Sequence, residues 1–112
     1  MAMREPTFFI LTALAVGPLH GYGVMQAVHE LSGGRLTLRA GTLYAALDRL
    51  TEDGLLEVDR EEAIDGRLRR YYRLTVDGTT ALKAEVELMR ANANLAAARL
   101  RRSGAPRMAY GR

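Results

Sequence analysis

The sequence predicts a mainly α-helical chain of the α+β class, with one small β-hairpin and a long C-terminal helix. Three observations predict this fold class. Apolar residues recur at helical spacing in three short segments of the first half of the chain. An Asp-Gly pair then separates two strand-like runs, and a heptad pattern of apolar residues follows for nearly three repeats. The 112 residues suffice for one compact core.

Three short helices come first. The first covers residues 7–16, with Pro6 in its first turn, where the missing N–H of proline costs nothing. It is apolar on nearly every side, so we expect it to be buried. The second covers residues 21–31 and the third residues 41–54. The apolar stripes of these two helices are Val24, Val28 and Leu31, and Leu43, Leu47 and Leu50.

A hairpin and a long helix complete the chain. The strands are expected over residues 55–61 and 68–74, with Asp65-Gly66 in the turn between them. Thr75 is typical of an N-cap, and the helix that it opens runs to about Arg101. Three short helices followed by a hairpin form the layout of a winged helix-turn-helix.

We therefore expect a winged helix-turn-helix domain over residues 5–76, a C-terminal dimerisation helix over 77–101 and a basic, disordered tail over 102–112. The formal net charge is +3, but residues 35–75 carry eight basic and eight acidic side chains. The tail region from Arg99 onward has five arginines and no acid. The total charge therefore does not indicate whether the body binds an anionic partner.

Composition argues against several classes of protein. The chain contains no cysteine, which removes disulfides, thiolate zinc sites and cysteine nucleophiles. No segment reaches the roughly 18 apolar residues of a membrane span. The two histidines, His20 and His29, have no grouped acids beside them. We expect a cytoplasmic protein that is no enzyme and has no metal, cofactor or membrane association.

Four motifs carry a resemblance to a known family. They are Leu-Thr-Ala-Leu at 11–14, His-Gly-Tyr-Gly at 20–23, Gly-Thr-Leu-Tyr at 41–44 and Gly-Arg-Leu-Arg-Arg-Tyr-Tyr-Arg-Leu-Thr at 66–75. In this order, over roughly residues 7–80, the chain resembles the PadR family of winged-helix regulators. Arg39 and Ala40 depart from the serine or proline often found there in the family, which leaves the N-cap of the third helix less clear.

The resemblance implies that the third helix enters the major groove of duplex DNA. Thr42 and Tyr44 would lie at its entering end, Arg49 would reach a base or a phosphate, and Arg39 would add a phosphate contact. Asp48 is expected to point away, because phosphates repel it. The alternative is an amphipathic helix with a solvated outer face.

Tyr22 and the hairpin supply further candidates. Tyr22 stands where free N–H groups bind phosphate, although it would equally pack between helices. We favour Arg67 and Arg69, near the tip of the hairpin, as DNA contacts. Arg70 and Arg73 are expected to pair with acids of the first strand instead.

The last helix predicts a homodimer. Its apolar residues follow a 4, 3 spacing along one face, and this face is longer than a small head domain can cover. The alternative is that the helix packs only on its own head. The resemblance implies a two-fold dimer with the first helix of the other subunit. A small apolar effector at this interface, near Phe8, Phe9 and Met89, is a further hypothesis, against plain core packing. The predicted interface comprises Phe8, Leu82, Val86, Met89, Ala93, Ala96 and Leu100.

Taken with the resemblance, these features predict a sequence-specific DNA-binding transcription regulator. It would act as a ligand-responsive repressor, as a homodimer on a palindromic operator. Two alternatives stay open. The fold would also serve as a protein–protein interaction module, and the arginine tail would support non-specific nucleic-acid binding.

Overall fold

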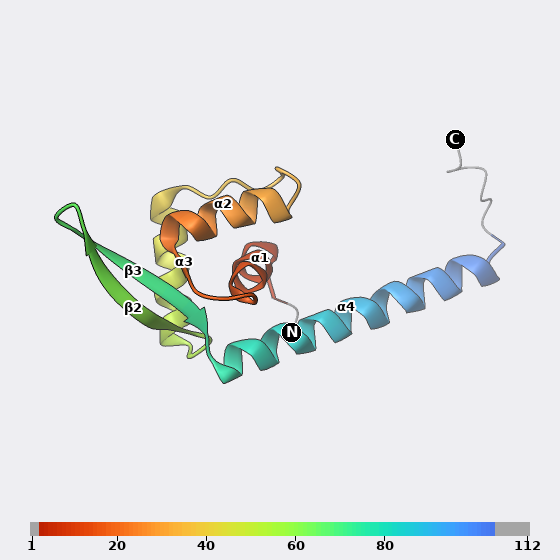
Figure 1. Cartoon of the computed structure of the whole chain (residues 1–112). Helices are drawn as coiled ribbons and strands as arrows, with labels where there is room; N and C mark the ends of the chain where they lie inside the picture. Colours follow the sequence, from red (N-terminus) through yellow and green to blue (C-terminus); the bar gives the residue numbers. More distant parts are fainter. Residues whose placement is uncertain (1–2, 105–112) are drawn as a thin grey trace.

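The computed structural model describes residues 3–104 (Figure 1). It contains four helices and a three-stranded antiparallel sheet with the strand order β1-β3-β2. The predicted α+β layout with a long C-terminal helix is confirmed. The elements are α1 (Glu5–Leu14), β1 (Leu19–His20), α2 (Gly21–Leu31), α3 (Ala40–Glu52), β2 (Leu56–Ile64), β3 (Arg67–Leu74) and α4 (Val76–Arg102).

Helix α1 forms the centre of the head. It contacts both α2 and α4, and Figure 1 shows it end-on between them. Ile10 and Leu11 are fully buried, as the apolar composition of the segment predicts. The buried cluster joins all three short helices to the sheet through Ile10, Leu11, Leu14, Val24, Val28, Leu43, Ala46, Leu47, Leu50, Leu56 and Tyr72.

The first helix lies two residues earlier than predicted. It begins at Glu5, and Pro6 stands within its first two positions, where proline is tolerated. It ends at Leu14, and the side chain of Val16 is almost fully exposed beyond it. Gly17 then turns the chain with a φ of 151°, which a residue with a side chain rarely adopts.

Strand β1 was not predicted from the sequence. Leu19 pairs with Tyr72 and His20 with Tyr71, so β3 becomes the central strand of the sheet. A two-residue strand has no periodicity that a sequence pattern can register. Its effect is nevertheless large, because it attaches the start of α2 directly to the hairpin.

The predicted turn and cap are both confirmed. Asp65 and Gly66 have φ values of 52° and 76°, as a tight two-residue hairpin turn requires. The Thr75 hydroxyl accepts a hydrogen bond from Gly78 N at 2.9 Å and donates one to the Gly54 carbonyl at 2.6 Å. Thr75 therefore caps α4 and ties it to the end of the α3–β2 loop.

Helix α4 projects away from the head (Figure 1). Its 27 residues span roughly 40 Å. Leu82 packs against the core cluster, and Glu85 accepts a hydrogen bond from Met3 N at 3.3 Å. Further along, apolar side chains are exposed, and Met89 and Leu100 have exposed fractions of 48% and 58%. A single copy of the chain therefore leaves this part of α4 uncovered.

Gly78 provides a test of the α4 junction. A Cβ there would overlap the Leu55 carbonyl oxygen, so we expect Gly78→Ala to lower the free energy of unfolding by about 2 kcal/mol. Gly41→Ala is the control, because Gly41 is also helical but has open space around its Cβ position. It should raise stability by about 0.5 kcal/mol. Urea unfolding at one fixed protein concentration measures both, and equal effects would contradict the tight junction.

Candidate nucleic-acid interface

A groove with a volume of about 710 Å³ runs between the start of α2, helix α3 and the hairpin. It is open to solvent, and one wall is helical while the other is the hairpin. Its lining residues are His20, Gly21, Tyr22, Tyr44, Asp48, Ile64, Asp65, Arg67, Leu68, Arg69, Arg70 and Tyr72.

The structure brings four of the seven candidate DNA-binding residues into this groove, namely Tyr22, Tyr44, Arg67 and Arg69. The other three, Arg39, Thr42 and Arg49, are exposed but do not line it. At about 100° per residue, Thr42 and Arg49 share one edge of α3. They therefore extend the candidate surface beyond the groove.

Asp48 also lines the groove, although it was expected from the sequence to point away from DNA. The reason is its position one helical turn after Tyr44, which places both side chains on the edge of α3 that faces the hairpin. The groove thus contains an acid on its helical wall.

Tyr44 packs on the start of α2. A Cβ at Gly21 would overlap the ring and hydroxyl of Tyr44, so only glycine allows this approach. Tyr22, by contrast, has an exposed fraction of 61%, and its hydroxyl accepts a hydrogen bond from Gln26 Nε2 at 3.5 Å. Tyr22 is therefore not packed between helices, which was the alternative from the sequence.

The two helix starts differ in how their N–H groups are used. His20 Nδ1 accepts a hydrogen bond from Gly23 N at 2.9 Å and so caps α2. Helix α3 has no side-chain cap at Arg39 and no acidic residue in its first turn. Its free N–H groups and the adjacent Arg39 form a positively polarised end, which suits an anion such as a phosphate.

Several arginines of the hairpin are neutralised locally. Arg73 donates to Glu57 at 2.8 Å and to Asp59 at 2.9 Å. Arg60 donates to Asp59 at 3.1 Å and to Glu62 at 3.2 Å, and the donation from Arg60 lowers the pKa of Glu62. These residues form one ion-pair network along the hairpin.

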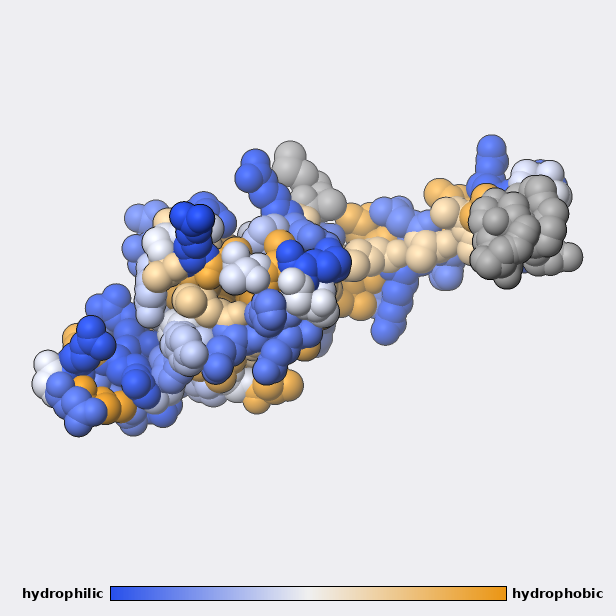
Figure 2. All heavy atoms as spheres, turned by 90° about the horizontal axis from the view of Figure 1, so that it is seen from above, coloured by the Kyte–Doolittle hydropathy of each residue, from blue (hydrophilic) through white to orange (hydrophobic). Residues whose placement is uncertain are grey.

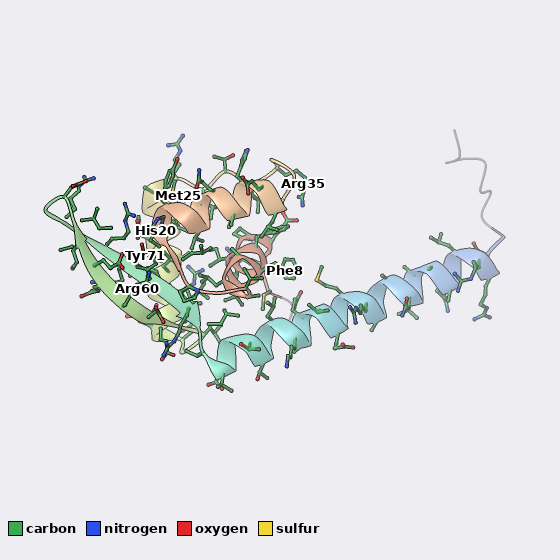
Figure 3. The ribbon with its side chains drawn as sticks, in the orientation of Figure 1. Phe8, His20, Met25, Arg35, Arg60 and Tyr71 are labelled. Carbon is green, nitrogen blue, oxygen red and sulfur yellow. The ribbon has the colours of Figure 1, made fainter. Side chains whose placement is uncertain are left out.

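Arg60 also covers an aromatic ring. Its guanidinium carbon lies 3.8 Å from the ring centroid of Tyr71, at cation–π distance. The ring of Tyr71 in turn contacts the His20 ring, with centroids 5.4 Å apart (Figure 3). A row of side chains thus runs from β2 across β3 to the cap of α2.

Arg70 forms a separate pair. It donates to Glu61 at 2.9 Å, and this bond raises the pKa of Arg70. Within residues 3–104, Arg67 and Arg69 form no ion pair, so their charges remain free for an external anion. Arg70 and Arg73 thus both pair with acids of β2, as expected from the sequence.

Among residues 3–104, no three acids or histidines cluster as metal ligands, and no helix is long and apolar enough to cross a membrane. Figure 2 shows polar residues around the head and apolar residues along α4 beyond it. A duplex nucleic acid, with a groove to receive α3 and phosphates for the arginines, fits the head.

Comparison with known proteins identifies the family. Residues 10–84 match the Transcriptional regulator PadR-like family. A transcriptional regulator of Mycobacterium tuberculosis is 44% identical over 73 residues, which cover 65% of this chain and 64% of the relative. The chain spans less than two thirds of the length of the curated relatives that it matches.

Solved structures support the same fold. PadR of Bacillus subtilis in complex with operator DNA is similar with a TM-score of 0.66 and 25% identity, over 74% of this chain and 47% of that one. A PadR family regulator of Clostridium difficile gives a TM-score of 0.71 at 22% identity, over 87% and 99%. The predicted winged helix-turn-helix is confirmed, and the chain belongs to the PadR-like family of transcriptional regulators.

Proposed function

We propose that this regulator binds duplex DNA in a sequence-specific manner, as a homodimer on a palindromic operator. The observation that carries the proposal is the groove between α3 and the hairpin, where Tyr22, Tyr44, Arg67 and Arg69 converge. The Bacillus subtilis PadR complex, which contains operator DNA, supports this use of the fold.

Helix α3 would supply base recognition. Thr42 and Arg49 share an exposed edge of the helix, and arginine is the side chain most often paired with guanine in the major groove. The uncapped start of α3 and Arg39 would hold a phosphate. These phosphate contacts would fix the position of the helix along the DNA, while the exposed edge of α3 would discriminate between bases.

The hairpin would act as the wing. Arg67 and Arg69 carry free charges next to the turn, where they would reach the backbone or a narrow minor groove. Because such contacts are largely independent of sequence, they add affinity and salt dependence.

Dimerisation would use the uncovered apolar face of α4. Met89, Ala93, Ala96 and Leu100 are exposed on it, whereas Leu82 and Val86 are already half-buried nearer the head. A second copy is the partner that two-fold symmetry supplies. It would place two α3 helices about one DNA turn apart, as a palindromic site requires.

A repressor released by a small apolar compound completes the proposal. Phe8 is half-buried on α1 and stacks edge-on against Phe9 at 5.3 Å, and Met89 is exposed on α4. If α4 of one copy lies along α1 of the other, these side chains line the contact. A compound held there would alter the spacing of the two heads.

DNA binding is tested by fluorescence anisotropy with a duplex from just upstream of the protein's own gene. We expect at least ~1,000-fold tighter binding than to a scrambled duplex, and a strong loss between about 50 and 200 mM salt. Equal binding to both duplexes would favour a non-specific binder. Binding to neither would favour a protein–protein module.

Two substitutions separate recognition from affinity. Arg67→Ala should weaken binding to both duplexes alike. It should also reduce the salt slope, the slope of the logarithm of the binding constant against the logarithm of the salt concentration, by about 0.9 in magnitude, the value of one phosphate contact. Arg49→Ala should cost about 1–3 kcal/mol on the specific duplex and little on the scrambled one. If the two variants behave identically, the assignment of base contacts to α3 is wrong.

The dimer is tested with Met89→Glu, which puts a charge on the apolar face of α4. Sedimentation should give a dimer for the wild type and a monomer for this variant. Asn94→Glu is the matched control, since Asn94 is exposed on the other side of the same helix, and it should stay dimeric. A wild-type monomer at tens of micromolar would contradict the proposal.

A further inference from the structure

Three arginines of the hairpin line the groove, but only two of them carry a free charge. Arg70 stands beside Arg67 and Arg69 in the lining, yet its guanidinium is bonded to Glu61. The two residues are direct partners in the β2–β3 register, and the Nε–Oε2 distance is 2.9 Å. About half of each side chain is exposed, at 47% and 42%.

The other ion pairs of the hairpin have no such position. Arg60 and Arg73 pair with Glu57, Asp59 and Glu62, and none of these five residues lines the groove. Arg70 points to the face of the buried Tyr72, whereas Arg67 and Arg69 lie on the opposite face and line the groove close to the turn. Arg73 shares their face but lies at the other end of β3, next to α4. Glu61 is thus the acid that forms an ion pair with an arginine of the groove lining, Arg70.

We infer that Glu61 restrains the DNA affinity of the wing by holding Arg70 away from phosphate, so that the groove offers two cations to DNA in place of three. This inference rests on the proposed DNA-binding function. Phosphate contacts add affinity without sequence information. A restrained Arg70 therefore lowers binding to any duplex and leaves discrimination to α3.

The strength of the ion pair is compatible with this role. Exposed pairs contribute up to about 1 kcal/mol, which corresponds to roughly fivefold in an equilibrium constant. Such a pair holds Arg70 for most of the time and still exchanges with solvent. Loss of the Glu61 charge would make the guanidinium available to a phosphate without disturbing the buried core.

Glu61→Gln is the test, with the operator and scrambled duplexes of the preceding experiment. We expect affinity for both to rise by roughly fivefold at low salt and the salt slope to steepen by about 0.9. Glu57→Gln is the matched control, since it makes the same change of net charge while Arg73 keeps its bond to Asp59, outside the groove lining. Its slope should equal that of the wild type. Equal steepening in both variants would mean that net charge alone is responsible, and would overturn the inference.

The double variant Glu61→Gln/Arg70→Gln shows whether Glu61 acts through Arg70. Compared with Arg70→Gln alone, its salt slope should be unchanged. A steeper slope in that background would show direct repulsion between Glu61 and DNA, which contradicts the inference. Thermal unfolding of each variant checks that the fold is kept. Absence of binding by the wild type to either duplex would refute the proposed function and this inference together, whereas wild-type binding with no effect of Glu61→Gln refutes the inference alone.

Discussion

The packing of Tyr72 at the centre of the sheet holds the two walls of the groove in place. Its backbone pairs with Leu19 on one side and Val58 on the other, and its side chain is only 3% exposed. The residue therefore belongs to the core and to the groove lining at once. Because β1 continues directly into α2, the start of α2 and the hairpin have a fixed separation. The approach of Tyr44 to Gly21 then places α3 against the same frame.

The distribution of charge around the groove depends on which way the side chains point more than on their net charge. The region from 35 to 75 is neutral by formal count, yet its charges are sorted. Asp59 accepts hydrogen bonds from both Arg60 and Arg73 and so neutralises two arginines outside the groove lining. Arg67 and Arg69 form no ion pair within the described chain, although Asp48 and Asp65 also line the groove. Local pairing thus leaves these two arginines as the unpaired cations of the hairpin beside the groove.

The sequence could predict the features that depend on local chemistry. The Asp65-Gly66 turn and the Thr75 cap follow from backbone preferences, and the stripe of α3 follows from helical periodicity. The features that the sequence could not predict depend on contacts between residues far apart in the chain. The register shifts between Val58 and Arg60, and the carboxylate of Asp59 at this irregularity accepts hydrogen bonds from two arginines. The groove position of Asp48 likewise depends on where the hairpin folds over α3.

The junction at Thr75 decides how α4 and the wing are related. Strand β3 ends at Leu74 and α4 starts at Val76, so a single residue separates the wing from the long helix. Thr75 is bonded on both sides of this junction, to Gly54 and Gly78, and the Leu55 carbonyl lies directly against Gly78. A rotation of α4 relative to the head would have to break these contacts or displace β3. Since β3 also carries Tyr72 and pairs with β1, such a displacement would reach both walls of the groove. The contacts of Thr75 and Gly78 therefore connect α4 directly to the strand that carries Arg67 and Arg69.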